Sequence, residues 1–511
     1  MNSGYAFCSL AITGLMIQPG CSPRDEVRKK DDSRHPNIIV ILADDLGFGD
    51  LSCYGSTQLR TPNIDRLAQS GLRFTNGYCS SATSTPSRFA LLTGSYPWRN
   101  QRARVLPGDA PLLIDTSLTT LPGMLRSAGY ATGIVGKWHL GLGNGQVDWN
   151  RRVGPGPNEV GFDYSFIMAA TNDRCPTVYL EDGRVVGLDP DDPIEVSYRE
   201  NFPGEPTGRE HPESIRMGLT HGHDGTIVNG ISRIGFMRGG ARARWVDEEM
   251  AGVFLEKAVE YVESNAERPF FLYFALHQPH VPRVPSPEFE GRSGLGPRGD
   301  VILEADWMVG ELLKSIDRLG IGKRTIILFT SDNGPVLDDG YADLAVELNG
   351  GHTPAGILRG GKYSLFDGGT HVPFIISWPG RINPGVSGAL VSQVDLAATF
   401  AQMTGQPNPG PDSENLLDAL MGQSEIGRTQ LILENGSGRT TLRSERWVLI
   451  PSYPGTPLFR LVNIESGFLG EPQLYDLVED PAQKNNLAPA LPEQVTELTQ
   501  ALLMQTTEKQ Q

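Results

Sequence analysis

Short apolar runs alternate with helix-like segments along most of the chain. The run NIIVIL at 37–42 is continuous, apolar and rich in β-branched residues, as is typical of a strand buried on both faces of a parallel sheet. Three later segments have a threonine and an early proline at their start and a glycine at their end, which predicts capped helices. These segments are residues 61–71, 85–94 and 119–129.

The alternation continues to about residue 380. Apolar runs followed by polar loops predict strands, and two amphipathic stretches predict long helices. The predicted strands lie within 130–141, 269–276, 324–334 and 371–380, and the long helices are 246–265 and 301–320. Such strand–helix alternation predicts an α/β fold with a large, mostly parallel or mixed sheet sandwiched between helices.

The pattern changes after about residue 424. TQLILEN, TTLRSERWVLIP and QLYDLVEDP look like short antiparallel strands, and 492–504 predicts a last helix. We therefore expect a large α/β domain at 36–424 and a smaller α+β subdomain, carrying an antiparallel sheet, at 425–511. Residues 145–245 are rich in loops and give no clear assignment.

The N-terminal region has the character of a targeting segment. The apolar run at 6–17 is too short to cross a bilayer comfortably, and residues 1–21 resemble a secretory signal peptide. Gly20-Cys21 resembles a relaxed lipoprotein cleavage site, so a lipid anchor at Cys21 is a second expectation. Residues 22–35 are polar and predict a flexible linker. We expect no transmembrane span and a location in the periplasm or at the cell surface.

Composition narrows the class of protein. The chain has 511 residues, of which 39% are hydrophobic and 20% charged, as is typical of a globular protein. Its 44 Lys and Arg against 60 Asp and Glu give a net charge of −16, which argues against nucleic acid as a partner. A local pocket can still bind an anion. The five cysteines form neither a CxxC pattern nor an even disulfide framework.

Polar groups follow two of the predicted strands. Asp44 and Asp45 come after the first strand, and Asp332 and Asn333 come after IILFT. Ligands of open α/β sheets bind outside the carboxyl ends of the strands, so these groups could hold a cation there. Hard oxygen donors of this kind suit Ca²⁺ or Mg²⁺ rather than zinc, since no His or Cys is interleaved with them. The alternative is ordinary turn chemistry, because Asp-Asp and Asp-Asn-Gly both form turns readily.

Cationic and proton-carrying side chains also lie in predicted loops beside strands or at a helix start. Together with a divalent cation they would make a site for a tetrahedral oxyanion. They are Arg88, Lys137, His139, His280 and Lys362. Ser84 stands immediately before a predicted helix, where backbone N–H groups and the helix dipole favour negative charge. It is either a nucleophile or an ordinary N-cap.

These blocks resemble the type I sulfatases of the alkaline-phosphatase-like superfamily. Ser84-Thr85-Pro86-Ser87-Arg88 followed by LLTGSYP resembles the family's Cys/Ser-x-Pro-x-Arg signature. Further blocks resemble the family in the same order, so the likeness extends from about residue 37 to 488. They are NIIVILADDLGFGD, TPNIDRLAQSG, GIVGKWHLG, TSDNG, GGKYSLFDGGTHVPFI and LYDLVEDPAQKNNLA.

The resemblance implies a modified residue at position 84. In the family this serine or cysteine is oxidised to Cα-formylglycine, and the serine form implies an anaerobic-type radical sulfatase-maturating enzyme as partner. The hydrated aldehyde attacks sulfur with one hydroxyl, and its second hydroxyl then expels sulfate. Carried over motif by motif, the implied Ca²⁺ ligands are Asp44, Asp45, Asp332, Asn333 and the formylglycine at Ser84.

The resemblance also assigns roles to the cationic set. Arg88 and Lys137 would stabilise the diol, His139 would be the base for its collapse, and His280 and Lys362 would grip the sulfate and assist the leaving oxygen. Sulfated saccharide would be the substrate, with a galactose or N-acetylgalactosamine type favoured. Polar clusters in the loop-rich region, or ordinary loop turns, supply candidate sugar contacts. These candidates are Asp173, Arg174, His221, His223 and His277.

Two other functions remain open from the sequence. One is a phosphomonoesterase or phosphodiesterase of the same superfamily, although those enzymes typically use two zinc ions and several metal-binding histidines. The other is a non-catalytic relative that binds sulfated glycans. Conversion of Ser84 in the native host would distinguish an enzyme from this second alternative.

Overall fold

The computed structural model describes residues 1, 4 and 35–507, and residues from Pro36 onwards form one unit. The predictions of a signal peptide, a lipid anchor at Cys21 and most of a linker at 22–35 therefore lie outside the described residues. Within the described part, no helix combines the length and apolar character needed to cross a bilayer.

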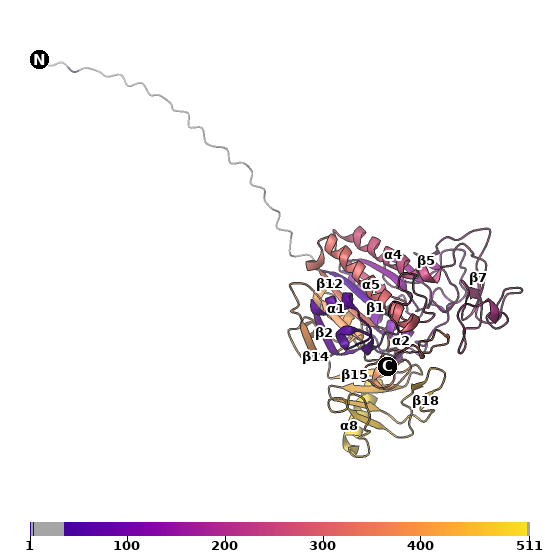
Figure 1. The fold of residues 1–511 in the computed structure, drawn as a ribbon. Coiled ribbons are helices and arrows are strands. Elements are labelled where there is room, and N and C mark those ends of the chain that lie inside the picture. Colours follow the sequence, from indigo (N-terminus) through magenta and orange to yellow (C-terminus); the bar gives the residue numbers. More distant parts are fainter. Residues whose placement is uncertain (2–3, 5–34, 508–511) are drawn as a thin grey trace. The chain divides into compact units, whose positions relative to one another are not determined.

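A ten-stranded mixed sheet forms the centre of the fold (Figure 1). In order across the sheet, its strands are β14 (Gly385–Ser392), β2 (Leu72–Tyr78), β13 (Phe374–Ser377), β12 (Thr325–Ser331), β1 (Asn37–Ala43), β11 (Phe270–Ala275), β3 (Ala131–Lys137), β4 (Tyr164–Met168), β5 (Tyr179–Glu181) and β6 (Arg184–Val185). The centre, from β12 through β1, β11 and β3 to β4, is parallel, whereas β13, β5 and β6 join antiparallel. The expected α/β class with a mixed sheet is confirmed.

Helices cover both faces of this sheet. The α-helices of the described chain are α1 (Pro62–Gln69), α2 (Ser84–Thr93), α3 (Leu121–Ser127), α4 (Met250–Asn265), α5 (Gly296–Arg318), α6 (Leu396–Thr404), α7 (Leu417–Leu420) and α8 (Pro492–Thr507), of which α8 packs instead against the C-terminal sheet described below. Alternate residues of β1 enter different cores: Val40 packs in a cluster with residues of α2, α3 and α6, whereas Ile41 packs with residues of α1, α4 and α5. Burial on both faces explains why this strand is apolar throughout.

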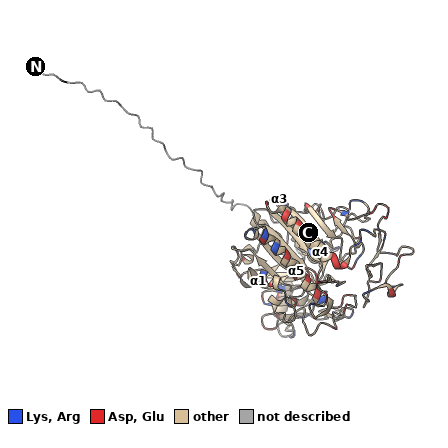
Figure 2. Ribbon diagram, turned by 45° about the horizontal axis from the view of Figure 1, so that its top comes forward, with Lys and Arg blue, Asp and Glu red and all other residues tan. Residues whose placement is uncertain are grey.

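The outer helices carry both signs of charge. Figure 2 shows acidic and basic positions interspersed along α5, whose sequence runs GPRGDVILEADWMVGELLKSIDR. The helix begins five residues before the predicted 301–320 stretch. The prediction missed this first part because it opens with a glycine and a proline, which do not follow the apolar period. Pro at the first turn is compatible with a helix start.

The C-terminal part contributes a separate four-stranded antiparallel sheet. Its strands, in order, are β15 (Gln430–Glu434), β16 (Thr440–Ser444), β17 (Trp447–Ile450) and β20 (Gln473–Asp476). Two-stranded ribbons complete the described strands: β7 (Glu195–Ser197) with β10 (Phe236–Arg238), β8 (Ile227–Val228) with β9 (Ile231–Ser232), and β18 (Leu458–Phe459) with β19 (Ile464–Glu465). The expected small antiparallel sheet is confirmed, and the boundary between 424 and 425 stays a prediction.

Candidate active site

The acidic groups meet at one edge of the sheet, as their positions predict. Asp44 and Asp45 follow β1, and Asp332 and Asn333 follow β12, the parallel neighbour of β1. All four are fully buried. The backbone N–H of Asp45 donates to Asp332 Oδ1 at 3.2 Å, and Asn333 Nδ2 donates to Asp45 Oδ1 at 2.7 Å. The two strand ends therefore form one connected polar cluster.

Ser84 lies at the start of α2 and points to this cluster. Its Oγ is 3.3 Å from Asp44 Oδ1, 3.3 Å from Asn333 Oδ1 and 3.1 Å from Lys137 Nζ. The prediction that Ser84 precedes the helix was wrong by one position, because Thr83 has the extended backbone of the N-cap and Ser84 is the first helical residue. Its side chain caps nothing and is aimed at the acidic groups instead.

Two buried cations contact the acidic cluster. Lys137, the last residue of β3, places Nζ 2.6 Å from Asp44 Oδ2. Arg88, one helical turn after Ser84, binds Asp332 Oδ2 through Nε at 2.9 Å and Nη2 at 2.8 Å. Neither cation is exposed to solvent. Both cations therefore interact with the carboxylates of the cluster and not with water.

Burial and the neighbouring charges shift the pKa values of Asp44 and Asp332 in opposite directions. Burial raises the pKa of Asp44, against the opposing effect of Lys137, and burial lowers the pKa of Lys137. For Asp332, burial is outweighed by Arg88 and Lys137, so its pKa is lowered. Asp44 thus lacks enough positive charge around it, and a divalent cation beside it would supply that charge.

His139, two residues after Lys137, has a ring nitrogen without a hydrogen-bond partner in the described chain. Its Nε2 lies 2.9 Å from the carbonyl of Leu106, which can only accept, so Nε2 carries the proton. The buried Nδ1 has no partner among the described residues and is left with its lone pair. Burial and the nearby Lys137 hold the pKa of His139 well below its usual range. The ring is therefore a neutral imidazole with an open acceptor.

Lys362 and His280 both lie close to Asp45. Lys362 Nζ is 2.8 Å from Asp45 Oδ2 and 2.7 Å from Asp339 Oδ2. His280 donates from Nδ1 to the carbonyl of Val281 at 2.6 Å and turns Nε2 towards Asp45 Oδ2, 3.9 Å away. Burial, with Lys362 and Lys137, lowers the pKa of His280, so this nitrogen also has a lone pair.

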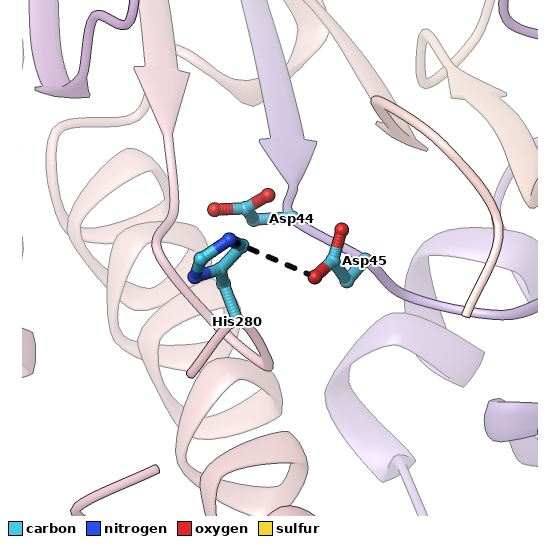
Figure 3. A group of neighbouring side chains, drawn as sticks. All are labelled: Asp44, Asp45 and His280. Atoms are coloured by element: carbon cyan, nitrogen blue, oxygen red, sulfur yellow. Dashed lines mark ion pairs between the residues drawn. The ribbon is translucent and has the colours of Figure 1, made fainter. Parts of the chain in front are cut away.

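The donor set at this edge fits a hard divalent cation. Figure 3 shows Asp44, Asp45 and His280, whose potential ligand atoms all lie within 4.8 Å of one another. Asp332 and Asn333 are adjacent, but one oxygen of Asp332 is taken by Arg88. Buried carboxylate oxygens and an amide oxygen are the donors that Ca²⁺ and Mg²⁺ prefer. The histidine nitrogen beside them is a feature that the oxygen-only expectation did not include.

A cavity of about 430 Å³ opens over Ser84. Besides Ser84, His139, His280 and Lys362, it is lined by four of the predicted sugar contacts. These four are Asp173, Arg174, His221 and His223. His277 does not line it: the ring is buried and lies 5.8 Å from the ring of Phe254.

Other residues that line the cavity were not predicted from the sequence. Asp339 binds Lys362, and Tyr363 donates its hydroxyl to Asp339 at 3.0 Å. Phe236, at the start of β10, adds an apolar wall. The run VLDDG after the DNG turn contained the signal for Asp339, namely two further carboxylates close to a strand end.

This arrangement brings together a hydroxyl at a helix start, several cationic side chains and a cluster of carboxylates with the donor atoms of a metal site. The hydroxyl lies at a cavity. The arrangement defines the class of hydrolases that act on esters of a tetrahedral oxyanion. Three comparisons narrow that class.

A family model described as Sulfatase matches residues 36–406. The chain is 48% identical over 495 residues to N-acetylgalactosamine-6-O-sulfatase of Bacteroides thetaiotaomicron, covering 96% of this chain and 97% of the relative. It is 32% identical to human arylsulfatase A, covering 92% and 87%. A solved structure from glycosaminoglycan metabolism in Bacteroides thetaiotaomicron superposes with a TM-score of 0.91 at 49% identity, covering 92% of this chain and 99% of the other. The chain belongs to the sulfatase family and is a sulfuric ester hydrolase.

Proposed function

We propose that the protein removes sulfate from a sulfated sugar of the N-acetylgalactosamine 6-sulfate type. The observation that carries this proposal is the cavity over Ser84, which is lined by Lys362 and His280 and also by Asp173, Arg174, His221 and His223. Lys362 suits a sulfate group, and the further polar side chains suit a polyhydroxylated ring. The 48% identity to N-acetylgalactosamine-6-O-sulfatase supports the choice of sugar.

We propose that Ser84 is the precursor of Cα-formylglycine, formed by an anaerobic-type radical maturating enzyme. When converted, the residue supplies a hydrated aldehyde with one hydroxyl for attack and a second for release of sulfate. Lys137 Nζ, 3.1 Å from Ser84 Oγ, is placed to stabilise negative charge on that oxygen. Arg88 holds Asp332 and also donates from Nη1 to the carbonyl of Lys137 at 3.1 Å, so it orients both partners.

Two histidines and a lysine complete the proposed machinery. The open Nδ1 of neutral His139 can accept a proton from the hydroxyl at position 84. Lys362 would hold a sulfate oxygen, and Asp339 keeps its Nζ in place. His280 Nε2 faces the same region and would assist at the leaving oxygen.

We propose Ca²⁺, in preference to Mg²⁺, as the metal. Asp44, Asp45, Asp332 and Asn333 would hold it, together with the group at position 84. Ca²⁺ tolerates irregular sets of oxygen ligands better than Mg²⁺, which demands near-ideal octahedral geometry. Between residues 35 and 507 a single cluster of His, Cys, Asp or Glu reaches metal-binding proximity, which does not favour the two-zinc phosphatase alternative.

We also propose that the protein works in the periplasm or at the cell surface. The apolar run at 6–17 and Cys21 support export, with or without a lipid anchor. Fractionation of the native host, combined with metabolic labelling by a fatty acid, tests both. Protein found only in the cytoplasm would contradict export, and exported but unlabelled protein would contradict the anchor.

Sulfate release from defined substrates tests the function. The matured enzyme should release sulfate from N-acetylgalactosamine 6-sulfate and not phosphate from the 6-phosphate analogue. Ser84→Ala, which lacks the oxidisable hydroxymethyl group, should release neither. Release of phosphate in preference to sulfate would favour the phosphoesterase alternative, and binding without any turnover would favour a glycan-binding protein.

A further inference from the structure

Three consecutive residues connect Lys362 to the segment that carries His221 and His223. Asp338, Asp339 and Gly340 follow the polar end of β12 by a few positions and form a tight turn, in which the N–H of Gly340 donates to Asp338 Oδ1 at 3.0 Å. The two carboxylates of this turn contact different parts of the site. The turn therefore links elements that lie far apart in the sequence.

Asp339 contacts Lys362, the proposed sulfate contact. Its Oδ2 accepts from Lys362 Nζ at 2.7 Å and its Oδ1 accepts from the hydroxyl of Tyr363 at 3.0 Å. Lys362 also binds Asp45 at 2.8 Å, so Asp339 is connected to the acidic cluster through a single side chain.

Asp338 contacts Thr220, which precedes His221. Its Oδ1 accepts from the hydroxyl of Thr220 at 2.6 Å, and the N–H of Thr220 donates to the carbonyl of Gly340 at 3.0 Å. Leu219 and Tyr341 form an antiparallel bridge next to this pair. Side-chain and main-chain bonds together fix the segment 219–221 on the turn.

The Thr220 hydroxyl determines the tautomer of His221. A threonine hydroxyl has one proton, and here it is given to the Asp338 carboxylate. Thr220 Oγ1 can then only accept from His221 Nδ1, which lies 3.2 Å away. With its proton on Nδ1, the neutral ring has a lone pair on Nε2. No group among residues 35–507 bonds that nitrogen, and His221 lines the cavity.

His223, the neighbouring histidine, cannot play the same part. Its Nε2 is 2.9 Å from Asp173 Oδ2 and its Nδ1 is 3.1 Å from the carbonyl of His221, so both ring nitrogens are taken. Gly340 leaves room for this ring: a Cβ there would lie 2.1 Å from His223 Nδ1, and its φ of +110° disfavours any other residue. The turn thus seats both histidines.

We propose that Thr220 and Asp338 are positioning residues that hold His221 with Nε2 as an acceptor for a hydroxyl of the sugar. This proposal rests on the proposed function, since it requires a sugar in the cavity. The turn from Asp338 to Gly340 then fixes His221, which contacts the sugar, relative to Lys362, which binds the sulfate group. Specificity for the sugar, rather than the chemistry at sulfur, depends on Thr220.

Thr220→Val tests the proposal, because it removes the hydroxyl and keeps the shape. With N-acetylgalactosamine 6-sulfate, the KM of the matured enzyme should rise about tenfold, the size of one net hydrogen bond, with kcat within about threefold. With 4-nitrophenyl sulfate, which has no sugar hydroxyl, kcat/KM should not change. Thr220→Ser should restore the wild-type KM, and Thr116→Val, at an exposed threonine, is the matched control.

Asp338 gives a second series that does not depend on the folding of Thr220→Val. Asp338→Asn keeps a weaker acceptor and Asp338→Ala keeps none, so the KM for the sugar should rise in that order. An unchanged KM in both series, or an equal loss on sugar and aryl sulfate, overturns the inference while the proposed function stands. A wild-type enzyme that hydrolyses 4-nitrophenyl sulfate but no sulfated sugar overturns both.

Discussion

A buried glutamate connects the C-terminal sheet to residues 80–82, which precede Ser84. Glu434, the last residue of β15, is 2% exposed, and its backbone pairs with this segment: its N–H donates to Ser80 at 3.1 Å and its carbonyl accepts from Ala82 at 2.8 Å. Arg104 Nη1 is 3.9 Å from the carboxylate and is itself 41% exposed. Little positive charge therefore compensates the carboxylate.

Burial raises the pKa of Glu434 from 4.5 to about 8, against the opposing effects of Arg104 and Ser81. The folded protein thus binds this proton more tightly than the unfolded chain does. The stability that the neutral carboxyl contributes is complete below pH 4.5 and is lost as pH rises towards about 8. Between pH 5 and pH 8 the loss is about 3 kcal/mol, since each pKa unit corresponds to about 1.4 kcal/mol.

Glu434→Gln removes the titration and keeps the side-chain shape. Urea unfolding at pH 5, 6.5 and 8 should give a free energy of unfolding close to wild type at pH 5 and about 3 kcal/mol above wild type at pH 8. Glu493→Gln, at an exposed glutamate of α8, should follow wild type throughout. A difference between Glu434→Gln and wild type that is the same at pH 5 and pH 8 would refute the reasoning.

Three further outcomes test the site. Arg88→Lys keeps the charge but loses the two-pronged contact with Asp332, so kcat/KM on sulfate esters should fall at least about 100-fold; a wild-type value would contradict the placement of Arg88. Lys362→Met leaves the buried carboxylate of Asp339 without its cation and removes one positive charge beside Asp45, so it should lower the free energy of unfolding by about 3–5 kcal/mol in urea, whereas exposed Lys314→Met should change it by less than about 0.5. A Ca²⁺ chelator should lower both the melting temperature and the activity, and added Ca²⁺ should restore both; no change in either would argue against a bound metal.

The polar cluster could be predicted because strand ends are visible in the sequence. Asp44 and Asp45 end one apolar run, Asp332 and Asn333 end another, and adjacent parallel strands bring such ends together. The proposed sugar contacts were harder to predict, because the loop-rich region that carries them is held by contacts between distant segments. The pairing of Thr220 with Gly340, for example, spans 120 positions and leaves no periodic pattern.

Two strands near one edge of the sheet, β14 and its neighbour β2, were also missed. β2 carries an Asn-Gly pair in its interior, and β14 begins with alternating glycine, serine and apolar residues, so neither shows a continuous apolar run. Partly exposed edges of a sheet do not require one. β13 runs antiparallel to both of its neighbours, β12 and β2. This direction depends on tertiary packing that the local sequence does not encode.

The mass of the peptide that contains Ser84, measured together with turnover on the same preparation, tests the central claim most directly. In protein purified from its native host, conversion to formylglycine should lower the peptide mass by about two units, and sulfate release should scale with the converted fraction. Full sulfatase activity with the peptide at its unmodified mass would contradict the account.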